Sequence, residues 1–94
     1  MIMEYHLSED AYKEYISVTK NNENTSYESA GMKLNRNIIL GKLIYDDTYA
    51  LKYQYGSLVI EVLFGEISRV YKSNYRRKFS GKKRYNLNKQ LQIT

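Results

Sequence analysis

Alternating apolar and polar residues dominate the stretch Thr48–Lys72, TYALKYQYGSLVIEVLFGEISRVYK. Successive side chains of an extended chain point to opposite faces, so this alternation predicts strands, and the β-branched and aromatic content favours the same structure. Gly56-Ser57 and Gly65-Glu66 divide the stretch in three and suit two-residue hairpin turns. We therefore expect a three-stranded antiparallel meander in which the middle strand, Leu58–Phe64, is the most apolar and the most buried.

The same alternation assigns the strand residues to faces. One side of the middle strand should carry Leu58, Ile60, Val62 and Phe64, and the other Val59, Glu61 and Leu63. In the last strand, one side should carry Ile67, Arg69 and Tyr71, and the other Ser68, Val70 and Lys72.

Helical spacing and capping residues mark two helices before the meander. Ser8 suits an N-cap and is followed by two acids, which the helix dipole favours; this helix should run to about Lys20. Thr25 or Ser26 should cap a second helix that ends near Gly41. The expected buried face of the first helix consists of Ala11, Tyr12, Tyr15 and Ile16.

Three shorter segments complete the predicted fold. Ile38–Leu40 is apolar all round, which predicts a deeply covered helix end, and Leu43–Tyr45 could already be extended. Ile2–Leu7 is close to alternating and could add a fourth strand. The predicted fold class is α+β, with two N-terminal helices packed on a three- or four-stranded antiparallel sheet in the order strand, helix, helix, three strands. Residues 1–72 form the predicted core domain and residues 73–94 a basic C-terminal segment.

Composition excludes several classes of chemistry. The chain has 94 residues and no cysteine, so it has no disulfides, zinc–thiolate sites or thiol nucleophiles. No apolar run reaches the roughly 20 residues that span a bilayer, and the N-terminus does not resemble a signal peptide, so a cytoplasmic location is expected. No P-loop, dinucleotide-binding, metalloprotease or nucleophile-elbow motif occurs, and we expect no cofactor and no metal. Asp46 and Asp47 form a turn, which is more often solvated than a cation site.

Charge is distributed very unevenly along the chain. Residues 1–68 hold six Lys and Arg against all ten Asp and Glu, a net charge of −4. Residues 69–94 hold nine Lys and Arg and no acid, a net charge of +9. Lys and Arg neutralise phosphates, and interleaved aromatic rings stack on unpaired bases. The predicted nucleic-acid-binding residues are Tyr75, Arg76, Arg77, Lys78, Phe79, Lys82, Lys83, Arg84 and Tyr85.

Three other interpretations of this basic segment remain open. A run of charge is often a solubilising segment without a ligand. The segment could instead fold on an acidic protein partner, or pack back on the acidic helix Ser8–Lys20.

His6, the only histidine, is a candidate proton carrier, although a single histidine on a terminal strand is more often a surface residue.

The order of elements and the string YALKYQYGSLVIEVLFGEISRVYK resemble the RelE/ParE toxin superfamily and the wider barnase–RelE-like RNases. The resemblance covers about residues 2–78. It implies a metal-independent RNase site on the concave face of the sheet and the C-terminal segment, where basic residues bind phosphate and a Tyr or His transfers a proton. The residues implied are Lys52, Arg69, Tyr71, Arg76 and Arg77, joined by His6 only if the first strand lies beside them.

Three functions are compatible with the sequence. We expect a small basic protein that binds nucleic acid, with RNA favoured, either without catalysis or as a RelE-like ribonuclease toxin. The alternative is a phage or mobile-element inhibitor that binds a host defence protein or nuclease through exposed tyrosines. An open edge strand would also allow a homodimer.

Overall fold

The structure, a computed structural model, describes residues 5–19, 24–74, 86, 88 and 89. Outside these ranges lie both predicted basic clusters, Arg76–Lys78 and Lys82–Arg84. The elements, in chain order, are β1 (His6–Leu7), α1 (Glu9–Val18), α2 (Tyr27–Leu40), β2 (Lys42–Asp46), β3 (Ala50–Tyr55), β4 (Leu58–Leu63) and β5 (Glu66–Lys72).

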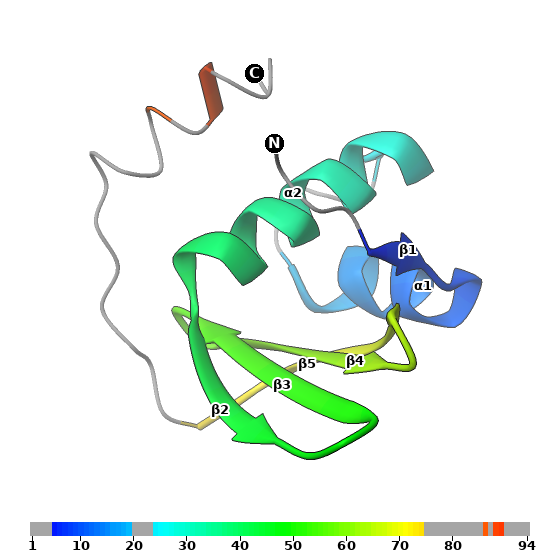
Figure 1. Cartoon of the computed structure of the whole chain (residues 1–94). Helices are drawn as coiled ribbons and strands as arrows, with labels where there is room; N and C mark the ends of the chain where they lie inside the picture. The colour runs from blue at the N-terminus through cyan, green and yellow to red at the C-terminus, as the bar shows by residue number, and fades with distance from the viewer. Residues whose placement is uncertain (1–4, 20–23, 75–85, 87, 90–94) are drawn as a thin grey trace.

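The sheet has five strands in the order β1-β5-β4-β3-β2, and the two helices pack on one of its faces (Figure 1). The predicted α+β class and the meander are confirmed, but the predicted three- or four-stranded antiparallel sheet is wrong in detail. β2 adds a strand by pairing with β3, and β1 runs parallel to β5. Alternation shows that a segment is extended, but it does not show in which direction a terminal strand will pair, so the mixed sheet was not predicted.

The first hairpin turn matches the prediction and the second does not. Gly56 has a φ of +62° at the first position of the Gly56-Ser57 turn. The second turn is Phe64-Gly65, one residue earlier than expected, and both residues have positive φ, +50° and +77°. Two consecutive positive φ angles match the twist of a type I′ hairpin. The turn removes Phe64 from the core, so its side chain is 79% exposed.

A β-bulge corrects the predicted faces of β5. Glu61 pairs with Arg69, but the next residue of β4, Val62, pairs with Ile67, so Ser68 is an extra residue in β5. The bulge brings Ile67 and Val70 to the same face, and both are buried in the core. The prediction that Ile67 shares a face with Arg69 and Tyr71 is therefore wrong.

The core lies between the helices and the sheet. Ser8 and Ser26 cap the helices as expected, with their Oγ atoms accepting the N–H groups of Ala11 and Ser29. β4 is the most buried strand, as expected for the centre of the meander, and Ile60 is fully buried. The core residues are Leu7, Ala11, Tyr15, Ala30, Leu34, Ile38, Leu58, Ile60, Val62, Ile67 and Val70.

The end of α2 is less covered than predicted. Ile38 is 8% exposed and packs in the core, whereas the next residue, Ile39, is 47% exposed. Five consecutive residues of α2, Leu34 to Ile38, are buried, so the helix is covered on more than its sheet side up to Ile38, and this cover ends at Ile39. The prediction that Ile38–Leu40 is covered on all sides is therefore wrong at Ile39.

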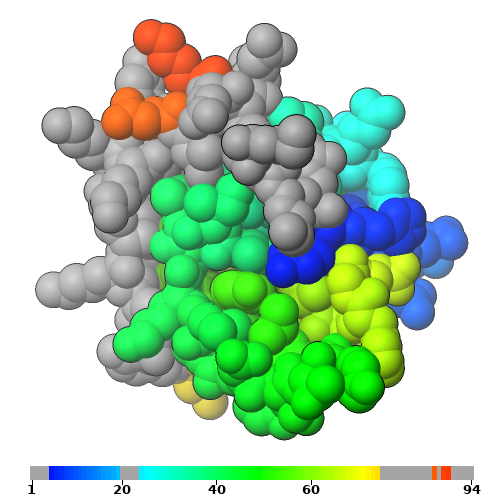
Figure 2. All heavy atoms as spheres, in the orientation of Figure 1, coloured from blue at the N-terminus to red at the C-terminus, as the bar shows by residue number. Residues whose placement is uncertain are grey.

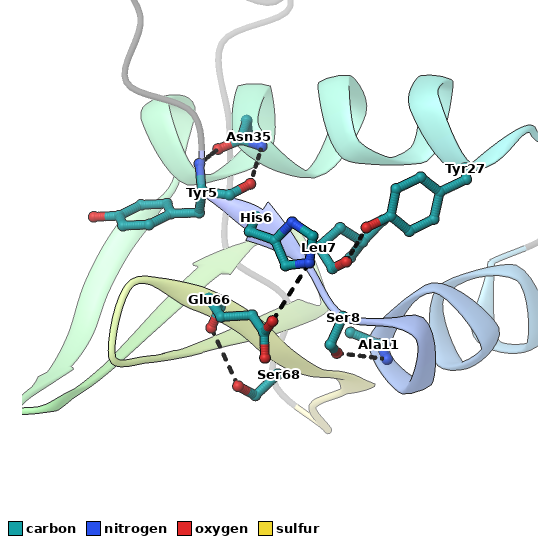
Figure 3. Close-up of polar contacts among 9 residues, drawn as sticks. All are labelled: Tyr5, His6, Leu7, Ser8, Ala11, Tyr27, Asn35, Glu66 and Ser68. Atoms are coloured by element: carbon teal, nitrogen blue, oxygen red, sulfur yellow. Dashed lines mark hydrogen bonds and ion pairs between the residues drawn. The ribbon is translucent and has the colours of Figure 1, made fainter.

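Side chains from both helices hold the β1 end of the sheet. Asn35 Oδ1 accepts the Tyr5 N–H at 2.7 Å and Asn35 Nδ2 donates to the Tyr5 carbonyl at 3.2 Å, so α2 pairs with the backbone beside β1 (Figure 3). The Tyr27 hydroxyl donates to the Leu7 carbonyl. Beyond the short β1, the Val70 N–H donates to Glu14 Oε1 at 2.9 Å. The carboxylate of Glu14 thereby covers an edge position of β5 that β1 does not pair.

Candidate functional site

Lys52, Arg69 and Tyr71, three of the residues that the resemblance implies for an RNase site, lie together on the face of the sheet away from the helices. Lys52 of β3 and Arg69 of β5 are both register partners of Glu61 in β4, so the three form one row across the sheet. Leu51, Val62 and other neighbours of these residues along their strands pack on or in the core. Side chains alternate between faces along a strand, so the row points outward. Tyr71 follows on the same side of β5.

The charges of this row are largely paired. Lys52 Nζ lies 3.8 Å from Glu61 Oε2, and Arg69 Nε lies 3.6 Å from Glu14 Oε2. Each cation also lies 5.3 Å from the centre of a tyrosine ring, Lys52 from Tyr45 in β2 and Arg69 from Tyr71. The row is therefore a carboxylate between two cations that already have anionic partners, rather than an uncompensated positive patch.

His6 lies elsewhere. His6 was expected to join the site only if the first strand lies beside the other site residues, and strand β1 pairs with β5 at Glu66 and Ile67, on the other side of the bulge from Arg69. His6 Nε2 lies 3.5 Å from Glu66 Oε2, and the imidazole is largely exposed (Figure 3). The structure thus gives His6 a surface carboxylate as its neighbour and does not bring it into the row.

Two carboxylates of this site were missed at the sequence level. Glu61 and Lys52 are equally distant from the Gly56-Ser57 turn, so a two-residue hairpin makes them direct partners. That signal was present in the sequence. Glu14 belongs to α1 and reaches Arg69 through tertiary packing of the helix along β5. No local pattern indicates that contact.

The predicted nucleic-acid-binding residues 75–85 fall in the part of the chain that the structure does not describe, but the residues on both sides of them are attached to the folded body. Before the segment, the Ser73 N–H donates to the Ser57 carbonyl at 2.7 Å. After it, Asn88 Oδ1 accepts from Arg36 Nη1 at 2.8 Å. Arg36 is a buried residue of α2, and its Nε and Nη2 donate to Asn37 Oδ1. The chain after β5 therefore returns to α2.

A second feature lies at the opposite end of the sheet from Ser57. The rings of Tyr49 and Phe64 stack with centroids 5.0 Å apart and are 64% and 79% exposed. Beside them is a cavity of about 560 Å³, lined by Tyr5, Asp46, Asp47, Thr48, Tyr49, Leu51, Val62, Phe64 and Gly65. Burial is the main cause that raises the pKa of the nearby Tyr53 phenol, and a hydrogen bond with Tyr5 raises this pKa further. The cavity thus combines exposed aromatic rings with two carboxylates.

The described ranges contain no cluster of metal ligands and no helix that could span a membrane. Among residues 5–19, 24–74, 86, 88 and 89, no three His, Asp or Glu side chains gather as metal ligands would. Neither α1 nor α2 is long and apolar enough to cross a bilayer.

Comparison with known proteins gives one result. Nothing matches among the curated proteins, and nothing matches among the solved structures. One family model, YorE, matches residues 5–90, which include both helices, all five strands and the basic clusters. The chain belongs to the YorE family.

Proposed function

We propose that this member of the YorE family is a small phage-associated protein that binds single-stranded RNA through residues 75–85. The observation that carries the proposal is the separation of charge, because residues 69–94 contain nine Lys and Arg and no acid. Six of these cations lie between Arg76 and Arg84, interleaved with Phe79 and flanked by Tyr75 and Tyr85. Cations neutralise phosphates and the rings stack on bases without a need for a particular sequence.

The described residues support the basic segment, rather than the sheet, as the main contact. Lys52 and Arg69 on the outer face already lie beside Glu61 and Glu14, so binding RNA there would displace existing ion pairs. Attachment at Ser73 and at Asn88 keeps both ends of the segment at the folded body. A ligand-binding segment whose ends are already fixed loses less conformational entropy on binding than a free tail.

A salt titration tests this proposal. Fluorescence anisotropy of a labelled unstructured RNA measures the affinity at each salt concentration. If six cations contact phosphates, the affinity should fall roughly 300-fold between 50 and 200 mM salt. Each contact with a single strand adds about 0.7 to the slope of the logarithm of affinity against the logarithm of salt concentration. The full chain is needed, because deletion after residue 72 would remove Asn88 and leave buried Arg36 without this partner. An affinity that does not change over this range would contradict the proposal.

We further propose that the bound RNA is cleaved at the Lys52–Glu61–Arg69 row, where the reacting phosphate would displace the present ion pairs of Lys52 and Arg69. Glu61 would accept the proton of a ribose 2′-hydroxyl, whose oxygen attacks the adjacent phosphorus. The bond from phosphorus to the 5′-oxygen breaks, and that oxygen takes up a proton, leaving a 2′,3′-cyclic phosphate and a 5′-hydroxyl. Lys52 and Arg69 lie where they could stabilise the charge that develops on phosphate.

The substitution Glu61→Gln should lower the cleavage rate by about 100-fold or more, because an amide cannot act as the general base. The matched control is Glu66→Gln, the same change at the β1 end of the sheet, where the carboxylate lies beside His6; it should leave cleavage near the wild-type rate. Rates are measured from the accumulation of cyclic-phosphate ends. Equal rates for wild type and Glu61→Gln would show that the row is not catalytic.

One observation favours a second function, binding to a host protein. The stacked pair Tyr49 and Phe64 is highly exposed, and exposed aromatic side chains often anchor protein interfaces. Asp46 and Asp47 line the adjacent cavity and would repel phosphates, so this end of the molecule fits a basic protein surface better than RNA. RNA binding would use the basic residues 75–85, whereas protein binding would use the acidic end of the sheet at Asp46 and Asp47.

A further inference from the structure

The outer strand β2 forms an edge of the sheet, and no described residue pairs with its outer side. It is last in the strand order, and within the described part of the chain it pairs with β3 alone. All five of its residues are exposed, including Leu43, Ile44 and Tyr45 at 41%, 39% and 47%. Figure 2 shows the green surface of β2 and the following turn at the lower front of the molecule. An exposed edge presents unpaired backbone N–H and C=O groups that can pair with another strand.

The backbone of β5, near the other edge of the sheet, has hydrogen-bonding partners. β5 is paired by β1, and the Val70 N–H beyond β1 is taken by Glu14. On β2, the centre of the strand carries neither a charge nor a proline, which are the residues that usually prevent edge pairing. Its charged residues, Lys42 and Asp46, lie at its two ends, and Asp47 follows directly.

We propose that β2 pairs antiparallel with β2 of a second copy of this chain, which joins the two sheets. Antiparallel pairing brings the Lys42 end of each strand beside the Asp46–Asp47 end of the other, whereas parallel pairing would bring like charges together. A two-fold axis repeats the favourable contact, so each dimer contains it twice. The apolar centres, Leu43 to Tyr45, then lie against each other and lose their exposed surface.

The short length of β2 and its register shift against β3 limit the affinity of the dimer. β2 has five residues, and its pairing with β3 shifts register between Leu43 and Tyr45. A bulge strengthens the local twist and shortens the length over which a second strand can pair. The dimer is therefore expected to dissociate on dilution, unlike the large apolar interfaces of obligate dimers. The dimer does not use the basic segment, so it does not depend on the proposed RNA binding there; it meets the Lys52–Glu61–Arg69 row only where the Tyr45 ring lies beside Lys52.

A reciprocal charge exchange tests the dimer. Sedimentation velocity of the full chain over a range of concentrations should show a reversible monomer–dimer equilibrium. Lys42→Glu makes both ends of β2 acidic, and Asp46→Lys adds a cation at the acidic end; each alone should weaken self-association by about tenfold. An equimolar mixture of the two variants should dimerise again, because the carboxylate introduced at position 42 of one variant then lies beside the ammonium group introduced at position 46 of the other.

Every outcome of this experiment bears on the proposal. Recovery of the dimer in the mixture supports β2 pairing and also shows that both variants are folded. A wild-type chain that stays monomeric at all concentrations overturns the proposal. A dimer that neither substitution weakens overturns it as well, because the copies then meet at another surface. Failure of the mixture to associate, when circular dichroism shows both variants folded, also overturns it.

Discussion

Substitution of all six cations of the two basic clusters by glutamine is expected to lower the affinity for single-stranded RNA by about 1000-fold near 150 mM salt. Six phosphate contacts contribute about 4 to the logarithmic salt slope of a single-stranded ligand, and their loss should remove that slope together with the affinity. Glutamine keeps a polar side chain of similar length, so the change removes charge with little loss of solubility. The residues changed are Arg76, Arg77, Lys78, Lys82, Lys83 and Arg84.

A charge-matched control separates local contacts from net charge. Substitution of one cluster alone lowers the net charge from +5 to +2 and should lower the salt slope by about 2. Substitution of Lys13, Lys20 and Lys33 by glutamine gives the same net charge and should leave the slope nearly unchanged. If the control loses as much affinity as a cluster variant, RNA responds to the overall charge of the protein and the basic segment is not the binding site.

Ile60→Ala is expected to lower the free energy of unfolding by about 2–5 kcal/mol, the range for large-to-small changes in a well-packed core. Ile60 is fully buried at the centre of β4, with Tyr53 and Val70 as its cross-strand neighbours. A single domain of this size has a stability of only about 5–15 kcal/mol, so the loss would be a large fraction of the total. Urea denaturation followed by circular dichroism measures the change.

Ile39→Ala provides the matched control, because it removes the same atoms from an exposed position of α2. Its effect should stay within about 0.5 kcal/mol, as is usual for surface substitutions. Comparable losses for the two substitutions would mean that Ile39 is covered, as the apolar sequence Ile38–Leu40 first suggests. The helix would then face the sheet through a different side from the one described above.

The parts of the fold that were predictable from sequence depend on local patterns. Alternation between Thr48 and Lys72, with glycine at a turn that needs positive φ, predicts the meander, and two serine caps fix where the helices begin. The structure differs from the prediction where packing between segments or strand twist determines the geometry. The bulge at Ser68 follows from burying both Ile67 and Val70, and the Phe64-Gly65 turn follows from the twist of the hairpin.

The candidate site shows the same division. Lys52 and Glu61 could be paired from their equal distances to one turn, while the contact of Glu14 with Arg69 depends on how α1 packs along β5. Arg36 was not singled out, because a buried arginine on a helix gives no local signal until Asn88 is placed beside it. Whether residues 75–85 bind RNA stays a prediction from charge and aromatic content.

RNA binding by residues 75–85 can be tested by mapping the backbone amides that respond to RNA. Two-dimensional ¹H–¹⁵N NMR spectra of the labelled full chain are recorded as an unstructured RNA oligonucleotide is added. The largest shift changes are expected within residues 75–85, with smaller changes at the row of Lys52, Glu61 and Arg69. Changes confined to Tyr49 and Phe64, or no change at low salt, would contradict this expectation and direct attention to a protein partner.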